Sequence, residues 1–466
     1  MRWKILGVAP VVLLVGAVLV ACRPVVPPTT PPPTTAPPPP SPMSLGWHDP
    51  GVDGPIAVDS ANNLLWAMNK GANKLDALNP STGAVVNSAT VTLNGAQHFP
   101  TPDVSGSTVV IEEGSGVAAF STPSEAVLWT SPALDGIIQA RPLIVGSIVV
   151  VATENNSLYG LNLADGTIAW SKLGVLGSPE TATHIHSFGT SGNNCGDVFP
   201  LGITSNPVLD ATSNFVYALG EVQTGTTSNA DPPEYKLIGV KPADGTVEVS
   251  PTVIDPASMT DTPFEQQRAA LAAANGHIYV GFGGLDGDCS TYHGYVVSAS
   301  DTTGSIVGDL EVSATTNAGA VWGTSGPVVD SAGNVYASTG NDTNLPPANQ
   351  TDYSDAVVKV PSTMSTEITV PPDYFQPAEW RSDNSSDLDL GSAGPVLLPN
   401  GTQLFIIGKQ HNAFLLNLSS LGGGDHLTPA ARLDNACSGQ AFGQNAVLGG
   451  SAYVACTTGM QQVILP

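Results

Sequence analysis

Short runs of β-branched, aromatic and other apolar residues recur along the chain after residue 43, separated by segments rich in Gly, Asn and Asp. Examples are Asn63 to Ala67, Ile148 to Ala152, Phe215 to Leu219 and His277 to Gly281. Runs of this length between turn residues are typical of β-strands and are short for the helices of a globular protein. The pattern therefore predicts an all-β fold.

A turn motif follows several of these runs. Its copies share a small first residue and a Gly that closes the turn: ALNPSTG (77–83), GLNLADG (160–166), GVKPADG (239–245) and the looser SASDTTG (298–304). The first frames start at Ala77, Ala119 and Gly160, and steps of about forty residues are the length of a four-stranded propeller blade. We therefore predict a β-propeller.

The innermost strand of each blade can be placed from the same pattern. These strands are expected to begin near Pro55, Pro102, Pro142, Pro207, Ala270, Pro327, Pro395 and Ala446. The count predicts eight blades, with seven as the alternative. Since the last unit holds only two or three strands before Pro466, either Ser44 to His48 closes the ring or the chain continues beyond Pro466.

Insertions lengthen the later repeats. They are rich in Gly, Ser, Asn, Asp and Pro and lie at 171–200, 221–234, 341–355 and 371–390. Long loops of this composition usually gather on one face of a propeller and carry its function.

The start of the chain has the pattern of export and anchoring. Arg2 and Lys4 precede an apolar run that ends in Leu-Val-Ala-Cys at Cys22, and the run is short for a membrane-spanning helix. We predict a signal peptide at 1–21 and lipidation of Cys22, with a plain signal peptide or a short anchor helix as the alternative. Residues 22–42 contain PPPTTAPPPP and form a stiff tether. The propeller, residues 43–466, is then expected on the extracytoplasmic side of the cell membrane.

The charge composition excludes one class of binding partner. The chain has 14 Lys and Arg against 39 Asp and Glu, a net charge of -25, which repels the phosphate backbone of nucleic acids. We therefore expect no nucleic-acid partner. The partners expected are the membrane, through the lipid anchor, and envelope proteins or a small ligand.

Four cysteines remain once Cys22 is set aside, and an even number in an exported chain indicates disulfides. We pair Cys437 with Cys456, which flank a hairpin centred near Gly449 and Gly450. The second pair, Cys195 with Cys289, would join two loops on the same face. No CxxCH motif is present, so no covalently attached haem is expected.

In two frames an aromatic residue closes a unit of eleven residues, Ala119 to Trp129 and Gly160 to Trp170. These units resemble the tryptophan-docking motif of the PQQ-like repeat propellers, the family of the quinoprotein alcohol dehydrogenases, in which the indole packs between blades. The equivalent position elsewhere holds Asn87, Val249 or Gly308. The resemblance implies the quinoprotein dehydrogenase type of propeller.

Four later segments, between residues 265 and 420, resemble that family in its own order. The dehydrogenases hold pyrroloquinoline quinone and a calcium ion over the propeller axis. In IYVGFGGLDGDCSTYHGYVVSASDTTG (278–304), Asp286 matches a calcium ligand, with Asp288 as the alternative. In AVWGTSGPVVDSAGNVYASTGN (320–341), Asn341 matches another. Oxygen ligands are what calcium requires.

The same resemblance assigns the quinone contacts and a base. Trp322 matches the tryptophan beneath the quinone and offers a flat stacking surface. Asp389, with Asp387 as the alternative, matches the catalytic base in YFQPAEWRSDNSSDLDLGSAGPVLL (374–398). Lys409, in LFIIGKQHNAFLLNLSSLGG (404–423), matches the basic residue that reaches the quinone oxygens. For the family's arginine the cations at hand are Arg268 and Arg141.

The chain also departs from that family. It has no adjacent pair of cysteines, and Asp stands where the dehydrogenases have a calcium-binding Glu. These departures favour a lipid-anchored binding or scaffold module of the cell envelope. The alternative is a calcium- and quinone-dependent dehydrogenase of alcohols or sugars. For the cofactor, the sequence leaves two alternatives of equal weight: pyrroloquinoline quinone together with calcium, or no cofactor.

Overall fold

A computed structural model describes residues 42–93, 98–189, 195–225, 231–347, 350–361 and 364–466. The expected signal peptide, Cys22 and nearly all of the expected tether fall in residues 1–41, outside this description. Within the described ranges, no helix has the length and apolar character needed to cross a bilayer.

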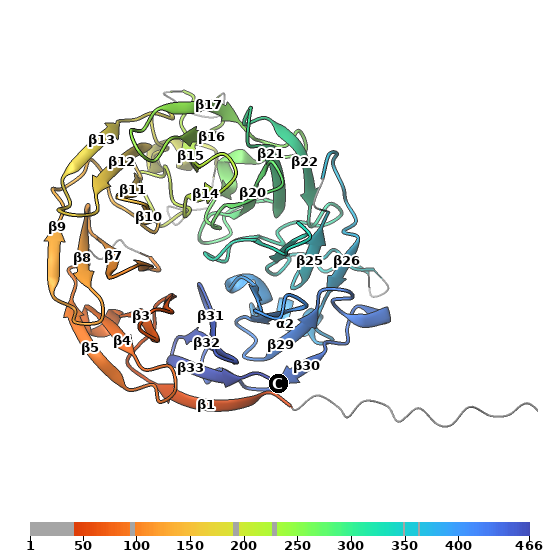
Figure 1. Ribbon diagram of the computed structural model, residues 1–466. Coiled ribbons are helices and arrows are strands. Elements are labelled where there is room, and N and C mark those ends of the chain that lie inside the picture. The colour runs from red at the N-terminus through yellow and green to blue at the C-terminus, as the bar shows by residue number, and fades with distance from the viewer. Residues whose placement is uncertain (1–41, 94–97, 190–194, 226–230, 348–349, 362–363) are drawn as a thin grey trace, which may run out of the picture. The chain divides into compact units, whose positions relative to one another are not determined.

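Eight antiparallel sheets surround a central axis as the blades of a propeller (Figure 1). The predicted fold class and the count of eight blades are confirmed, and seven is wrong. Blades 1 to 4 are, from the axis outward, β2 (Ile56–Asp59), β3 (Leu64–Asn69), β4 (Lys74–Leu78), β5 (Val85–Thr90); β6 (Asp103–Ser105), β7 (Thr108–Glu113), β8 (Gly116–Ser121), β9 (Val127–Thr130); β10 (Leu143–Val145), β11 (Ile148–Thr153), β12 (Ser157–Asn162), β13 (Ile168–Lys172); β14 (Val208–Asp210), β15 (Phe215–Val222), β16 (Glu234–Val240), β17 (Val247–Val253).

Blades 5 to 8 are β18 (Glu265–Gln266) and β19 (Ala272–Ala274), β20 (His277–Gly284), β21 (Tyr295–Ser300), β22 (Ile306–Glu311); β23 (Val328–Val329), β24 (Val335–Ser338), β25 (Val357–Val360), β26 (Asp373–Phe375); β27 (Val396–Leu397), β28 (Gln403–Ile407), β29 (Ala413–Asn417), β30 (Ala431–Leu433); β31 (Ala446–Leu448), β32 (Ser451–Cys456), β33 (Gly459–Ile464), β1 (Ser44–Asp49). Short helices α1 (Ala182–Ser187) and α2 (Trp380–Asn384) lie in the insertions that follow β13 and β26.

The inner strands start within two residues of the predicted positions. In most blades a proline directly precedes the strand, as Pro142 precedes β10. Proline has no N–H group and is therefore tolerated at the start of a strand that borders the open axis. This is why the prolines marked the blades in the sequence.

The N-terminal strand closes the ring. β1 pairs antiparallel with β33, with Ser44 opposite Ile464 and Leu45 opposite Val463, and the two strands lie side by side in Figure 1. Of the two alternatives for the last blade, closure by Ser44 to His48 is the one observed. The outermost strand of blade 8 therefore comes from the other end of the chain.

The predicted docking of Trp129 and Trp170 between blades is confirmed. Their indole Nε1 atoms each donate a 2.8 Å hydrogen bond to a carbonyl oxygen in the next blade, that of Leu163 and of Pro242. Trp47 of β1 makes the same contact with the oxygen of Pro80, at 2.9 Å. The sequence pattern missed Trp47 because its blade combines the two ends of the chain.

Apolar side chains between neighbouring sheets form the core. Between blades 4 and 5, for example, buried Tyr217, Tyr235, Ile278, Phe282 and Tyr295 pack into one cluster. Each sheet is covered on both faces by its neighbours, so its central strands read as continuous apolar runs. The blades in turn hold the loops at the inner strand ends in place.

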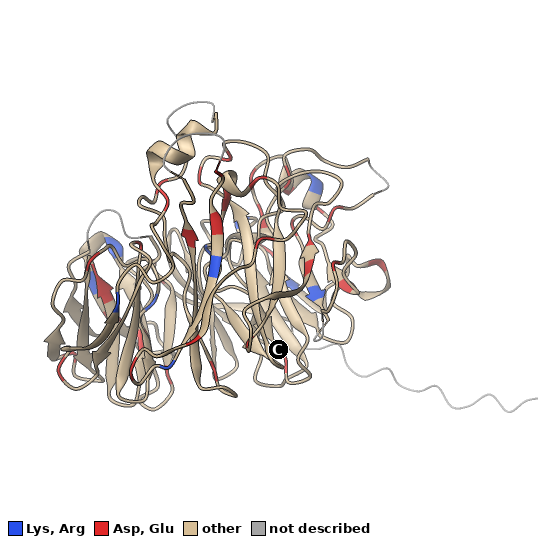
Figure 2. Cartoon of the chain, turned by 90° about the horizontal axis from the view of Figure 1, so that it is seen from above, with Lys and Arg blue, Asp and Glu red and all other residues tan. Residues whose placement is uncertain are grey.

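Both predicted disulfides are present. The Cα atoms are 5.5 Å apart for Cys195–Cys289 and 5.9 Å apart for Cys437–Cys456. Gly449 and Gly450 form the two-residue turn of the predicted hairpin, with φ of 57° and 81°, a left-handed conformation that glycine adopts without strain. Figure 2 shows the longer loops rising from one side of the ring, while short turns occupy the other.

Candidate ligand-binding site at the propeller axis

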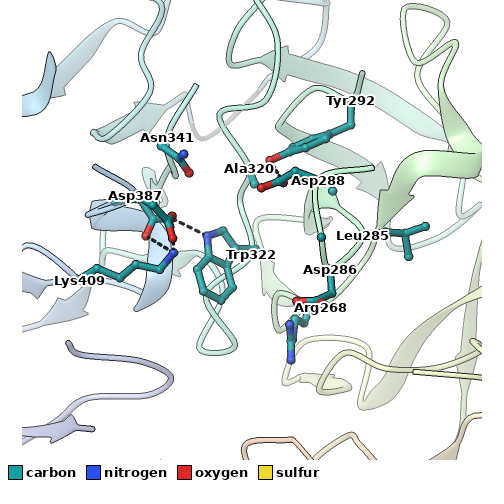
Figure 3. A pocket seen from close by; sticks show the side chains of 13 residues that line it. Arg268, Leu285, Asp286, Asp288, Tyr292, Ala320, Trp322, Asn341, Asp387 and Lys409 are labelled. Carbon is teal, nitrogen blue, oxygen red and sulfur yellow. Dashed lines mark hydrogen bonds and ion pairs between the residues drawn. The ribbon is translucent and has the colours of Figure 1, made fainter. Parts of the chain in front are cut away.

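A pocket of about 300 Å³ lies between loops of blades 5, 6 and 7 (Figure 3). We call it the axis pocket. Of the two candidate cations, Arg268 lines the pocket and Arg141 does not. The other predicted site residues that are not cysteines all line it: Asp286, Asp288, Trp322, Asn341, Asp387, Asp389 and Lys409, together with Gly284, Leu285, Gly287, Tyr292 and Ala320. The structure thus brings the predicted site residues together, and their roles stay predictions.

Blade 5 supplies one wall. Arg268 lies between β18 and β19, and Asp286 and Asp288 lie in the loop after β20. The hydroxyl of Tyr292 donates a 2.9 Å hydrogen bond to Asp288 Oδ1. This loop is tied to the insertion before blade 4 by the Cys195–Cys289 disulfide and by a 2.9 Å hydrogen bond from Gly196 N to Asp286 O.

Blades 6 and 7 supply the rest in matching positions. Trp322 precedes inner strand β23, and Asn341 follows β24. In the next blade, Asp389 precedes β27 and Lys409 follows β28. Because neighbouring blades repeat the same path, these positions meet at the inner ends of the two sheets.

Asp389 is the centre of the polar network. Its side chain is 1% exposed, and its Oδ2 accepts a 2.9 Å hydrogen bond from Trp322 Nε1. Lys409 Nζ lies 3.3 Å from Asp389 Oδ1 and donates to Asp387 Oδ1 at 2.7 Å. Burial raises the pKa of Asp389 to about 6, and the opposing effects of Lys409 and Trp322 limit the rise.

Gly340 makes this close approach feasible. A Cβ atom at this position would lie 2.8 Å from Asp389 Oδ2 and 3.1 Å from Trp322 Nε1. A larger residue would therefore displace the indole or the carboxylate.

The charges are unevenly placed around the indole. Figure 3 shows Asp387 and Lys409 on one side of Trp322, and Asp286, Asp288 and Arg268 on the other. Across the described ranges, no three His, Cys, Asp or Glu side chains gather as ligands of a metal ion. The oxygen ligands predicted for a calcium ion, Asn341 with Asp286 or Asp288, all line this pocket.

Sequence analysis missed two aromatic residues of the site. The Phe442 ring centroid lies 6.0 Å from that of Trp322 and 6.2 Å from that of Phe99. Phe99 precedes β6 and Phe442 precedes β31, so loops of blades 2 and 8 meet Trp322 of blade 6 beside the pocket. An aromatic residue four to six positions before an inner strand is the shared signal that could have found all three.

Residues 71–247 match a family model described as outer membrane protein assembly factor BamB. Among solved structures, the fold is similar to BamB from Moraxella catarrhalis, with 15% identity, a TM-score of 0.55, and coverage of 90% of this chain and 99% of that one. It is also similar to a europium-containing methanol dehydrogenase, with 12% identity, a TM-score of 0.57, and coverage of 88% and 84%.

A quinohemoprotein alcohol dehydrogenase from Comamonas testosteroni matches at 10% identity and a TM-score of 0.53, over 88% of this chain and 72% of that one. No curated protein matches the sequence. Identities this low establish the fold alone. The chain is an eight-bladed β-propeller that is similar in fold to BamB and to the quinoprotein alcohol dehydrogenases, and the repeat match over residues 71–247 agrees with that likeness.

Proposed function

We propose that this chain is a lipid-anchored binding propeller of the cell envelope, which takes a small, flat, negatively charged ligand in the axis pocket. The observation that carries the proposal is the convergence of Trp322, Asp389, Lys409 and Arg268 on one pocket. Enclosed pockets of a few hundred Å³ with a few convergent polar groups are the usual form of small-molecule sites.

The envelope setting is supported from two directions. The matched family model is described as an outer membrane protein assembly factor, and the N-terminal sequence has the pattern of a lipoprotein signal. A scaffold role towards envelope proteins is compatible with a ligand in the pocket, because the outer rim of the blades is distant from the axis.

The ligand class follows from the lining. The indole of Trp322, which packs against the ring of Phe442, offers apolar surface to a flat conjugated molecule, and Arg268 offers a cation. Pyrroloquinoline quinone, a planar tricarboxylate, is the candidate that fits this set. Trp322 would stack with its rings, and Lys409 and Arg268 would lie beside its oxygens.

A second candidate function is a quinone-dependent dehydrogenase. The specific observation in its favour is Asp389, a buried carboxyl group with a pKa near 6 that adjoins the pocket. A group of this pKa is suited to accept a hydroxyl proton near neutral pH. Bound pyrroloquinoline quinone would supply the electron acceptor for that oxidation.

Titration of the full chain with pyrroloquinoline quinone, with and without calcium, tests both candidates. The quinone absorbance and the melting temperature should both shift on binding, and Trp322→Ala should abolish the shifts. Leu345→Ala removes an exposed apolar side chain from a neighbouring loop and should leave them unchanged.

Turnover separates the two functions. Oxidation of an alcohol in the presence of an artificial electron acceptor, lost in Asp389→Asn while quinone binding persists, would establish the dehydrogenase. Binding with no turnover would establish the binding module. Absence of quinone binding to the wild type would contradict both.

A further inference from the structure

The cations of the axis pocket differ in how far their charge is balanced. Lys409 is held by two carboxylates, with Nζ 2.7 Å from Asp387 Oδ1 and 3.3 Å from Asp389 Oδ1. Arg268 has no carboxylate oxygen of a described residue within 4.0 Å and no hydrogen bond to one. Its contact is with a ring, because its guanidinium carbon lies 5.1 Å from the ring centroid of Phe99.

A second cation reaches the same ring. Lys70 Nζ lies 4.9 Å from the centroid of Phe99 and likewise has no ion pair among the described residues. Lys70 begins the turn η1 (Lys70–Ala72) that follows β3 of blade 1. Two cations without a salt bridge therefore share one aromatic ring in a chain of net charge -25.

The carboxylates in the neighbourhood are engaged elsewhere. Asp53 Oδ1 accepts a hydrogen bond from the backbone N of Lys70 at 2.9 Å. Asp197 pairs with His98 at 3.3 Å, and Glu154 accepts a hydrogen bond from Gly202 N at 2.7 Å. Asp286, exposed in the loop after β20, raises the pKa of Arg268 through space only, as Asp197 and Glu154 do; burial, the larger effect, lowers that pKa.

Phe99, which contacts both cations, has an unusual backbone conformation. Phe99 has φ of 49°, a left-handed conformation that costs a bulky residue about 1 to 3 kcal/mol. Phe99 and Arg268 also line a narrow cavity of about 20 Å³, which shares Arg268 with the axis pocket. In that cavity the buried hydroxyl of Thr324 has no partner among the described residues.

A partly buried cation without a carboxylate in direct contact is costly unless an anion completes it. The guanidinium fork matches a carboxylate or an oxyanion with two parallel hydrogen bonds. We propose that Arg268, which lines the axis pocket, forms an anion-binding site together with Lys70 beside the ring of Phe99, and that an oxyanionic group occupies it. That group is either a carboxylate of the ligand inferred above, in which case this proposal rests on the proposed function, or a free inorganic oxyanion.

Calorimetric titration of the full chain with three probes tests the proposal: naphthalene-2-carboxylate, the neutral naphthalene-2-methanol with the same rings, and sodium sulfate. The carboxylate should bind more tightly than the alcohol. Arg268→Gln and Lys70→Gln should each weaken carboxylate binding about tenfold or more, the usual effect of losing a hydrogen bond to a charged group. Binding of the alcohol should not change in either variant.

Lys74→Gln provides the control, because it removes the same charge from an exposed position on β4. Arg268→Lys should keep part of the preference, and together with Lys70→Gln it carries the test if Arg268→Gln fails to fold. Sulfate that binds in the wild type, competes with the carboxylate and is lost in the variants would show that the site accepts a free anion.

The remaining outcomes separate the two proposals. Equal binding of both naphthalene probes, or a preference for the carboxylate that the variants leave intact, would overturn the anion site while the axis pocket stands. Sulfate binding that depends on Arg268 and Lys70, with no binding of either naphthalene probe or of the quinone, would keep the anion site and overturn the proposed function. No binding of any probe would overturn both.

Discussion

Glu112 is a single buried residue that is expected to make the stability of this protein depend on pH. It lies on β7 and is 1% exposed. Its Oε1 accepts a 3.0 Å hydrogen bond from Thr101 N, and its Oε2 has no partner among the described residues. Burial raises the pKa of Glu112 to about 8, so this carboxyl group is mostly protonated at neutral pH.

This shift predicts the direction of a pH effect. A pKa raised from about 4.3 in the unfolded chain means that only the folded state keeps this proton between about pH 4.3 and 8. The contribution of Glu112 to stability is therefore lost as the pH rises through this window, and it changes little at higher pH. Glu112→Gln should therefore melt at a higher temperature than the wild type at pH 9 and close to it at pH 5. Glu113→Gln, on the same strand, is the control. A variant that is equally stabilised or destabilised at both pH values would contradict the expectation.

Some residues at or near the site could be predicted from the sequence and others could not. Trp322, Asn341, Asp389 and Lys409 stand at fixed places relative to the inner strands of two consecutive blades, so their meeting was predictable. Lys70, Phe99 and Phe442 lie outside the stretch with family motifs. Phe442 contacts Trp322 of the pocket lining, Phe99 contacts Arg268, and Lys70 contacts Phe99. These contacts arise only because the ring closes, and closure is a long-range property.

At the scale of elements, β1 is the strand on which the ring depends. It joins blade 8 through β33 and contacts blade 1 through Trp47. The indole of Trp47 packs beside Gly83, where an added Cβ atom would lie 2.4 Å from the ring. The ring centroids of Trp47 and Tyr453 are 5.7 Å apart. β1 therefore links blade 8 to blade 1, through its pairing with β33 and through the contacts of Trp47.

Trp47→Ala should lower the free energy of unfolding by about 2 to 4 kcal/mol, since it removes a partly buried aromatic contact and a hydrogen bond. Trp47→Phe should lower it by about 1 kcal/mol, because the ring remains and the hydrogen bond is lost. Urea denaturation measures both. Leu45→Ala, on the same strand but with a side chain that is 50% exposed, should change little. An unaffected Trp47→Ala would show that closure does not rely on this contact.

At the scale of the whole molecule, the fold was largely predictable. Prolines before inner strands, turn motifs and two docking tryptophans repeat with the blades, and each has a local physical cause. The closing partner of the last blade remained open because strand pairing across the full chain leaves no local trace. The family match covers residues 71–247, the part where the turn motifs are most regular.

The anchor is the other property of the whole molecule. If Cys22 is lipidated, a fatty-acid analogue should label the wild type and not Cys22→Ser, and the variant should be released into the medium. The Pro-rich tether has no membrane affinity of its own, so the variant that lacks the lipid has nothing to hold it at the membrane. Equal labelling of both proteins would contradict the lipoprotein assignment. Retention of unlabelled variant on the membrane would indicate an anchor helix instead.

The most direct test of the central claim is a diffraction structure of the chain crystallised with pyrroloquinoline quinone and calcium. The ligand should lie in the axis pocket against the indole of Trp322, with a carboxylate at Arg268. Ligand density on the outer rim of the blades, or an empty pocket at saturating quinone, would contradict the assignment of the axis pocket as the binding site.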